Sequence, residues 1–262
     1  MVKRSLRWRR RWLVIGLALA ATVIAGGLAV TWAAGLLFPD TARPASVEDA
    51  LRQFREGDPH PAKLDGVYLY ATRGEESLDV LGGARHPYPA TTTLTLVEVP
   101  CGVRLGWSPL VGRSTTWTLC MRSRASELQR LDEVHSFFGS TDRTLYSCTA
   151  TVLRPARATI GETGPLSCRS QHDTEEGQVR VVGRARIDVG GAYVNALRIR
   201  TTARVTGGDR GTETVDWWLD ASADLPLQLV VASRTSRPVP LVGRARYREQ
   251  AELTLVSMTP LR

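Results

Sequence analysis

Two of the four histidines in the chain have neighbours that could support acid–base or metal chemistry. His135 follows Asp132 and Glu133, and on a helix Asp132 and His135 would share one face and could hold a metal or a proton together. A catalytic zinc site needs three protein ligands and an open position, so this pair is one ligand short. His86 lies in the aromatic-bearing segment 82–89, which we predict to be a loop. These residues support a hydrolase hypothesis, with a site around His86 or His135, which is the weakest of the three functional hypotheses that the sequence allows.

The motifs of the common nucleophilic enzymes are missing from the chain. There is no Gly-x-Ser-x-Gly, no Ser-x-x-Lys, and no glycine loop followed by the lysine of a phosphate-binding loop. The paired carboxylates Glu75-Glu76 and Glu175-Glu176 fall in predicted turns, where we interpret them as solvated charge. We therefore predict that the protein is not an enzyme, with no catalytic residue, no metal and no cofactor.

Large aromatic side chains near the predicted strands are the candidates for binding. Trp217 and Trp218 are adjacent, so a regular strand directs them to opposite faces. One can join the core, whereas the other must be covered by a helix, a ligand or a partner, or be exposed; large exposed aromatics often mark interaction surfaces. The predicted ligand-binding residues are Trp107, Trp117, Trp217, Trp218 and Tyr193.

Four cysteines, Cys101, Cys120, Cys148 and Cys168, predict two disulfides. A metal site is disfavoured because no Cys-x-x-Cys pair exists. Four cysteines allow three pairings. We favour Cys101–Cys120 and Cys148–Cys168, because each bond would close a short loop and could join neighbouring strands.

The charge of the chain is concentrated at its N-terminus. The 262 residues include 34 Lys+Arg and 26 Asp+Glu, for a net charge of +8. Six basic residues lie within the first eleven, so 34 − 6 = 28 basic and 26 acidic residues remain, a charge of +2 for residues 12–262. The basicity therefore does not predict a nucleic-acid partner.

An uncharged stretch follows the basic tail. Residues 13–38 are long enough to cross a bilayer, which takes about 20 apolar residues. The positive-inside rule predicts a cytoplasmic tail over 1–12, a transmembrane helix over 13–38 and an extracytoplasmic remainder. The sequence thus predicts a single-pass cell-membrane protein; a cleaved signal peptide is the alternative.

Residues 39–63 are predicted to form a stalk containing one short helix. Ser46 is a suitable N-cap, and Val47, Leu51 and Phe54 then form one apolar stripe at helical spacing.

From residue 64 to 262 the apolar residues mostly alternate with polar ones, which predicts antiparallel strands. Gly190-Gly191 marks a hairpin. On the final strand one side carries Ala245, Tyr247, Ala251, Leu253 and Leu255. The best helix candidate is 126–138. We predict one mostly-β domain: a curved antiparallel sheet or half-barrel, or a sandwich, with few short helices.

The closing third of the chain resembles lipoprotein-carrier domains of the LolA, LolB and LppX type. The resemblance rests on the hairpin at 189–191, Gly211, Trp-Trp-Leu-Asp at 217–220 and Asp-Leu-Pro-Leu at 224–227. It implies a curved sheet wrapped around helices, with an apolar, lipid-accepting cavity. As a whole the chain looks like the membrane-anchored secreted proteins of high-GC bacteria.

The first functional hypothesis is therefore a non-enzymatic envelope protein that binds an apolar ligand such as a lipid, or an envelope partner, in a cavity or concave face. The alternative is a purely structural or protein-interaction module.

Overall fold

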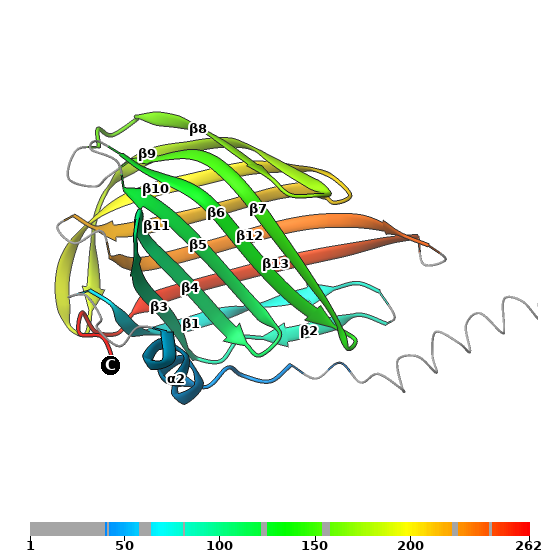
Figure 1. The fold of residues 1–262 in the computed structure, drawn as a ribbon, viewed down its shortest axis with the longest axis horizontal. Coiled ribbons are helices and arrows are strands. Elements are labelled where there is room, and N and C mark those ends of the chain that lie inside the picture. The colour runs from blue at the N-terminus through cyan, green and yellow to red at the C-terminus, as the bar shows by residue number, and fades with distance from the viewer. Residues whose placement is uncertain are drawn as a thin grey trace, which may run out of the picture.

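The computed structural model describes residues 40, 42–57, 64–80, 82–121, 125–153, 158–221, 225–240 and 243–262. Within these residues, one helix precedes a sheet of thirteen strands (Figure 1). The helix is α2 (Val47–Gly57), and the strands are β1 (Gly66–Leu78), β2 (Ala84–Pro87), β3 (Thr91–Val99), β4 (Gly102–Leu110), β5 (Arg113–Met121), β6 (Ala125–Phe137), β7 (Ser140–Leu153), β8 (Thr163–Arg169), β9 (Asp173–Val189), β10 (Ala192–Gly207), β11 (Arg210–Asp220), β12 (Pro226–Val239) and β13 (Gly243–Leu255).

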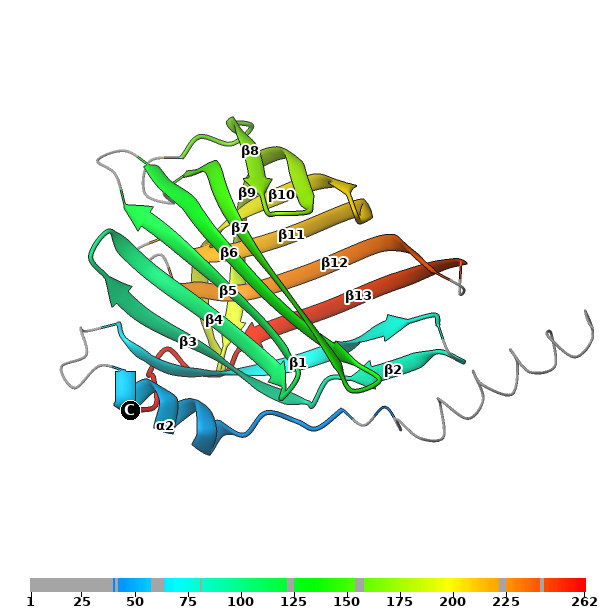
Figure 2. The ribbon, with the colours of Figure 1, turned by 45° about the vertical axis from the view of Figure 1, so that its right-hand side comes forward.

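The sheet closes on itself. Neighbours along the chain pair from β3 to β13, and β13 pairs with β1, for example Tyr70 opposite Leu255. With β2 set aside as a short extension on β1, the result is a closed twelve-stranded antiparallel barrel (Figures 1 and 2). The prediction of an open half-barrel or sandwich was therefore wrong. Alternation specifies which residues face inward, but the pairing of the first strand with the last leaves no pattern in the sequence.

Two different strands pair with β1 along different parts of its length. Residues 66–71 of β1 pair with β3, and residues 75–78 pair with β2. Residues 43–45 run along the end of β4: the Ala45 amide donates to the Pro109 carbonyl at 3.1 Å, and the Val111 amide donates to the Arg43 carbonyl at 2.9 Å. The chain before α2 therefore adds to the barrel wall.

The helix of the predicted stalk is confirmed as α2. The Asp49 amide donates to Oγ of Ser46 at 2.9 Å, which caps the helix, and Phe54 is buried. The helix lies against β1 and β3, close to the C-terminus (Figure 2), and the Arg55 guanidinium donates to the carbonyl of Arg262 at 2.6 Å. Residues 58–63 of the predicted stalk lie outside the described residues.

No helix in the described part of the chain is long and apolar enough to cross a membrane, because α2 has only 11 residues and a charged face. The structure therefore does not support the transmembrane helix or the single-pass membrane localisation predicted from the sequence. The predicted tail and span, 1–12 and 13–38, lie outside the described residues.

The predicted helix over 126–138 is wrong, because this segment is strand β6. The pairing of β6 with both neighbours skips Gln129, which marks a β-bulge. Leu128 and Leu131 are consequently both buried although they lie three residues apart. The three-residue interval from Leu128 to Leu131, which resembles helical spacing in the sequence, is the spacing across this bulge.

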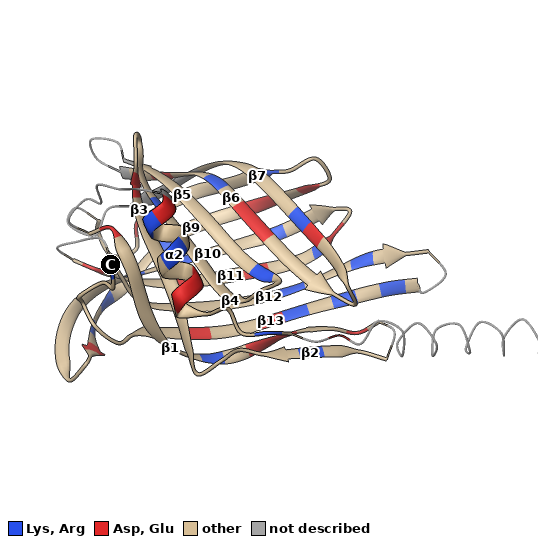
Figure 3. Ribbon diagram, turned by 60° about the horizontal axis from the view of Figure 1, so that its bottom comes forward, with Lys and Arg blue, Asp and Glu red and all other residues tan. Residues whose placement is uncertain are grey.

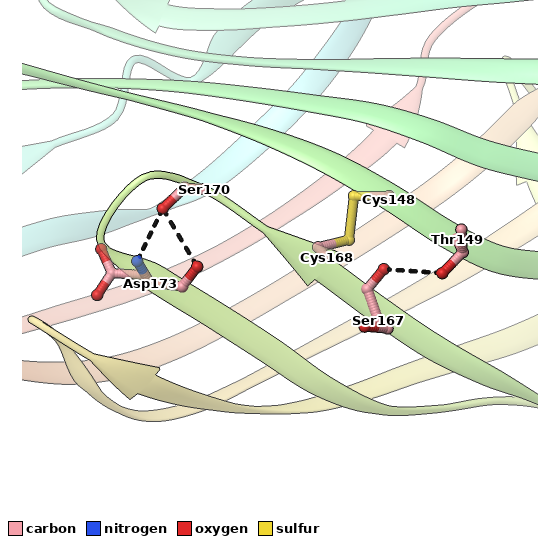
Figure 4. The surroundings of a disulfide bond; sticks show 6 residues. All are labelled: Cys148, Thr149, Ser167, Cys168, Ser170 and Asp173. Carbon is pink, nitrogen blue, oxygen red and sulfur yellow. Dashed lines mark hydrogen bonds between the residues drawn. A yellow bond between two sulfur atoms is a disulfide. The ribbon is translucent and has the colours of Figure 1, made fainter.

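Both favoured disulfides are confirmed. Cys148 and Cys168 lie directly opposite each other on β7 and β8 and are bonded, beside the hydrogen bond from the Thr149 hydroxyl to the Ser167 carbonyl (Figure 4). Cys101, in the turn after β3, is bonded to Cys120 of β5. Each bond therefore joins segments of the wall that are close neighbours.

Candidate functional site

A cavity of about 350 Å³ lies inside the barrel, at the end where the β6–β7, β10–β11 and β12–β13 hairpins turn. Another part of the interior holds a packed core that includes Tyr68, Leu94 and Trp107. Leu78, Phe137, Val205 and Val239 form an apolar part of the cavity lining, and the remaining lining is largely polar.

Carboxylates reach the cavity because they occupy inward positions of strands whose other inward residues are apolar. On β9, Glu175 lies an even number of residues from the buried Val179 and Val181, so all three share the inner face. On β11, Glu213 has the same parity as the buried Val215. Since successive side chains of a strand alternate between faces, these acids cannot reach solvent on the outside of the wall.

Three of these acids form a cluster, which we call the glutamate cluster: Glu133 of β6, Glu175 and Glu213. Each contributes one carboxylate oxygen, and these oxygens lie within 4.8 Å of one another. Burial, and then the charge of Glu133, raises the pKa of Glu175 to about 8, although a hydrogen bond with Tyr146 opposes the shift. Burial and the charge of Glu175 also raise the pKa of Glu213 well above its usual range. Glu175 and Glu213 therefore bind protons more tightly than ordinary carboxyls do, and a nearby positive charge would favour their ionised forms.

A buried ion pair lies next to the cavity. The Arg113 guanidinium donates to Oε2 of Glu249 at 2.8 Å and to Oγ1 of Thr115 at 2.6 Å. The Tyr88 hydroxyl donates to the same carboxylate, and so does that of Tyr247, at 3.1 Å. Burial alone would raise the pKa of Glu249, but the guanidinium of Arg113 lowers it below its usual range. Glu249 is thus neutralised by its own partner, unlike the glutamate cluster.

The two histidines of the hydrolase hypothesis meet at one carboxylate. Nδ1 of His86 lies 3.0 Å from Oε1 of Glu76, and Nδ1 of His135 lies 3.4 Å from Oε2. His86 is buried and stacks on Phe137 with ring centroids 4.5 Å apart, whereas His135 lines the cavity. Both lie in strands, His86 in β2 and His135 in β6, so the predicted loop around His86 is in part a strand.

The predicted partnership of His135 with Asp132 does not form. Three residues apart on a strand, the two side chains face opposite sides of the wall. Asp132 instead accepts hydrogen bonds from Arg143 at 2.9 and 2.6 Å on the outside.

At the rim of the cavity, Arg237 is held between two acids. It lies 2.9 Å from the carboxylate of Asp142 and donates to Asp209 at 3.0 and 2.9 Å. These contacts, the hydrogen bond to Asp209 first, raise the pKa of Arg237 above its usual value. The rim therefore carries a charged but internally paired group.

None of the five aromatic residues predicted to bind a ligand lines the cavity. Trp107 is fully buried, and its Nε1–H donates to Oγ1 of Thr92 at 3.2 Å. Trp117 and Trp217 pack edge to face, with centroids 5.0 Å apart, against the core. The other two aromatics each contact an arginine: Trp218, which is half-buried, lies 4.8 Å from Arg198, and Tyr193, which is exposed, lies 4.9 Å from Arg186. Ligand binding by these five residues stays a prediction.

The interpretation of Glu76 and Glu175 as solvated turn residues was wrong, because both lie within strands and are buried. A signal for them was present in the sequence. Each glutamate lies at an alternate position that shares a face with apolar residues of its strand. The same is true of Glu249, which lies between Tyr247 and Ala251 on that face. An acid at an inward position of an otherwise apolar row indicates a polar barrel interior.

The fold and site together define a closed antiparallel β-barrel with an acidic internal cavity. No protein-family model, curated protein or solved structure matches the chain. The resemblance to the LolA, LolB and LppX type therefore stays a prediction.

Proposed function

We propose that the protein is a non-enzymatic binding protein that holds a small amphipathic ligand with a cationic group inside its barrel. The observation that carries the proposal is the cavity of about 350 Å³, because small-molecule sites are typically about 300–1,000 Å³ and few per protein. A cavity of this size also favours binding over the alternative of a purely structural module.

The charge of the lining supports a cationic group. Arg237 is satisfied by Asp142 and Asp209, and Arg113 by Glu249. The glutamate cluster forms no ion pair with any described cationic side chain, and ionising its buried carboxyls without a nearby positive charge is costly. A ligand ammonium group placed there would supply the compensation.

The apolar part of the lining supports a hydrocarbon portion. Leu78, Phe137, Val205 and Val239 all contact the cavity and come from four different strands or their ends. An alkyl chain placed against them would be shielded from water, which is favourable by about 25 cal/mol per Å² of apolar surface. The proposal therefore narrows the apolar ligand expected from the sequence to an amphipathic amine.

Three small-molecule probes with the same alkyl chain and different headgroups test the proposal: octylamine, octanol and octanoate. Each is used below its aggregation concentration. Thermal unfolding and calorimetric titration of the full chain should show that octylamine binds tightest and octanoate weakest. Equal binding of all three would favour a simple lipid site and contradict the cationic specificity. Binding of none would contradict the proposal as a whole.

Matched variants connect the binding to the cavity. Thr144→Trp should fill the cavity and abolish octylamine binding. Glu175→Gln together with Glu213→Gln should reduce the preference for octylamine over octanol by at least tenfold. Glu252→Gln, which removes an acid that pairs with Arg73 on the outer face, should leave the preference unchanged.

A further inference from the structure

The outer wall over β10 to β13 carries a group of arginines that we call the arginine face: Arg204, Arg210, Arg234, Arg246 and Arg248. All five are exposed. They alternate with inward residues such as Val205 and Tyr247, so the strands direct them away from the cavity. Figure 3 shows the basic positions along β12 and β13.

The register aligns these arginines in two rows across the strands. In the first row, Arg204 faces Thr212, which faces Arg234, which lies directly opposite Arg248. In the second row, Ser236 lies between Arg210 and Arg246. Because neighbouring strands are about 4.8 Å apart, the first row spans about 14 Å.

Most of this positive charge has no counter-charge. Arg246 lies 3.2 Å from Asp79, and Arg204 lies directly opposite Glu176 of β9, although these two side chains form no ion pair. Arg210, Arg234 and Arg248 form no ion pair with any residue that the structure describes. Like charges placed directly opposite each other on antiparallel strands are destabilising. The pair Arg234–Arg248 is therefore a cost to the fold in the absence of an anion.

The fold itself creates this imbalance. The +2 of residues 12–262 describes a nearly neutral chain. Five strand carboxylates, however, point into the barrel: Glu76, Glu133, Glu175, Glu213 and Glu249. With these acids inside, the arginines dominate the outer wall of β10 to β13.

We propose that the arginine face is a docking surface for a linear, phosphate-bearing polyanion. Guanidinium groups bind phosphate oxygens in a bidentate manner, and a row of them across a convex wall suits a flexible chain better than a flat surface. Base stacking is not provided: Tyr193, the one aromatic among the large exposed apolar side chains of the described residues, lies at the opposite end of β10 beside Arg186. The surface therefore recognises backbone charge. This proposal concerns the outer wall and is independent of the ligand inside the barrel.

Polyphosphate is the probe, and its binding to the full chain is measured by fluorescence anisotropy as a function of salt. The three arginines that neither contact nor face an acid should give a slope of log affinity against log salt of about −2. The double variant Arg234→Gln, Arg248→Gln should weaken binding by at least tenfold and reduce the slope by one to two. Its unfolding temperature should be unchanged or higher, because a repulsive pair has been removed.

A matched control removes the same charge elsewhere. Arg104 and Arg130 are exposed on β4 and β6, and each faces Thr118 of β5. Arg104→Gln with Arg130→Gln should leave polyphosphate binding within about twofold of the unchanged protein. If both double variants weakened polyphosphate binding equally, binding would depend on net charge and not on the arginine face, and the proposal would be overturned.

Three further outcomes would also overturn it. The first is the absence of polyphosphate binding. The second is tighter binding of single-stranded DNA of equal charge, which would indicate that bases are recognised. The third is binding to anionic phospholipid vesicles without binding to polyphosphate, which would indicate that the partner is a membrane surface.

Discussion

Nε2 of His86 lies 2.7 Å from Oδ2 of Asp40, and this hydrogen bond ties the chain before α2 to β2. The other oxygen of Asp40 accepts the Phe138 amide at 3.0 Å, in the β6–β7 hairpin. Phe138 has a φ of +52°, a left-handed conformation that is uncommon for a bulky residue and is held here by its surroundings. At the end of the barrel that holds the cavity, one carboxylate therefore connects three segments that are remote in sequence.

Replacement of Asp40 by alanine should destabilise the barrel by about 2 kcal/mol, because two hydrogen bonds to a charged group are lost. Hydrogen exchange should also show faster exchange of the Phe138 amide, which a general loss of stability would not single out. The control is Asp49→Ala, which removes an exposed ion pair to Arg52 and should cost less than about 1 kcal/mol. Equal effects of the two variants would contradict the role assigned to Asp40.

The barrel should become less stable as the pH rises from about 5 to about 8. In the folded state burial raises the pKa of Glu175 to about 8, whereas the unfolded carboxyl titrates near its ordinary value of 4.5. Between these values the folded state binds more protons than the unfolded state, so stability falls as the pH rises. The change should be on the order of 2–4 kcal/mol, measured by urea unfolding.

Glu175→Gln should flatten this pH dependence and stabilise the protein at pH 8. Its neighbour Glu176, which is exposed on the other side of β9, is the matched control, and Glu176→Gln should keep the slope. If the stability of Glu175→Gln fell with pH as steeply as that of the unchanged protein, the buried carboxyl of Glu175 would not be the source of the pH dependence.

Binding of octylamine at pH 7 should release protons, because a nearby ammonium group lowers the pKa of the carboxyls in the glutamate cluster. Calorimetric titrations in phosphate and in Tris, which differ in ionisation enthalpy, should therefore give different apparent enthalpies. Identical enthalpies would place the amine away from the glutamate cluster.

Removal of the disulfide between Cys148 and Cys168 by a double serine variant should cost about 3 kcal/mol, the entropy of closing a loop of this size. The two residues are 20 positions apart. Urea unfolding under non-reducing conditions measures the loss. The corresponding Cys101/Cys120 variant, with a separation of 19, should lose a similar amount, and a loss below 1 kcal/mol in both would contradict a stabilising role.

The two adjacent tryptophans should differ strongly in their contribution. Trp217→Ala removes a ring packed against Trp117 and the core and should cost about 3–5 kcal/mol. Trp218→Ala removes a half-buried ring on the other face of β11 that contacts Arg198 and also packs against the core, and it should cost less, about 1–2 kcal/mol. Equal losses in denaturant unfolding would show that the two faces are not distinguished as the structure indicates.

Local features of the fold were accessible from the sequence. Alternation predicted that Ala245, Tyr247, Ala251, Leu253 and Leu255 share a face, and all but the half-buried Tyr247 are buried. Gly190 and Gly191 form the predicted hairpin, with positive φ values of +60° and +88°. These features depend on near neighbours, so periodicity and turn chemistry are sufficient to find them.

The candidate site was less accessible. His86 and His135 were identified as a possible centre, but their common partner Glu76 was not, because it belongs to a different strand and was interpreted as a turn residue. The glutamate cluster joins residues of β6, β9 and β11, which meet only across the interior of a closed barrel. Sequence spacing contains no information on such contacts.

By itself the sequence determined that the chain forms antiparallel strands and which cysteines are suitably spaced to pair, because alternation and loop length are local properties. It also determined a net charge of +2 for residues 12–262. Only the tertiary structure decided where that charge lies. Closure of β13 onto β1 encloses the inward glutamates and leaves the arginines outside, since a closed sheet has one inner and one outer face. The acidic cavity and the arginine face are thus two consequences of the same closure.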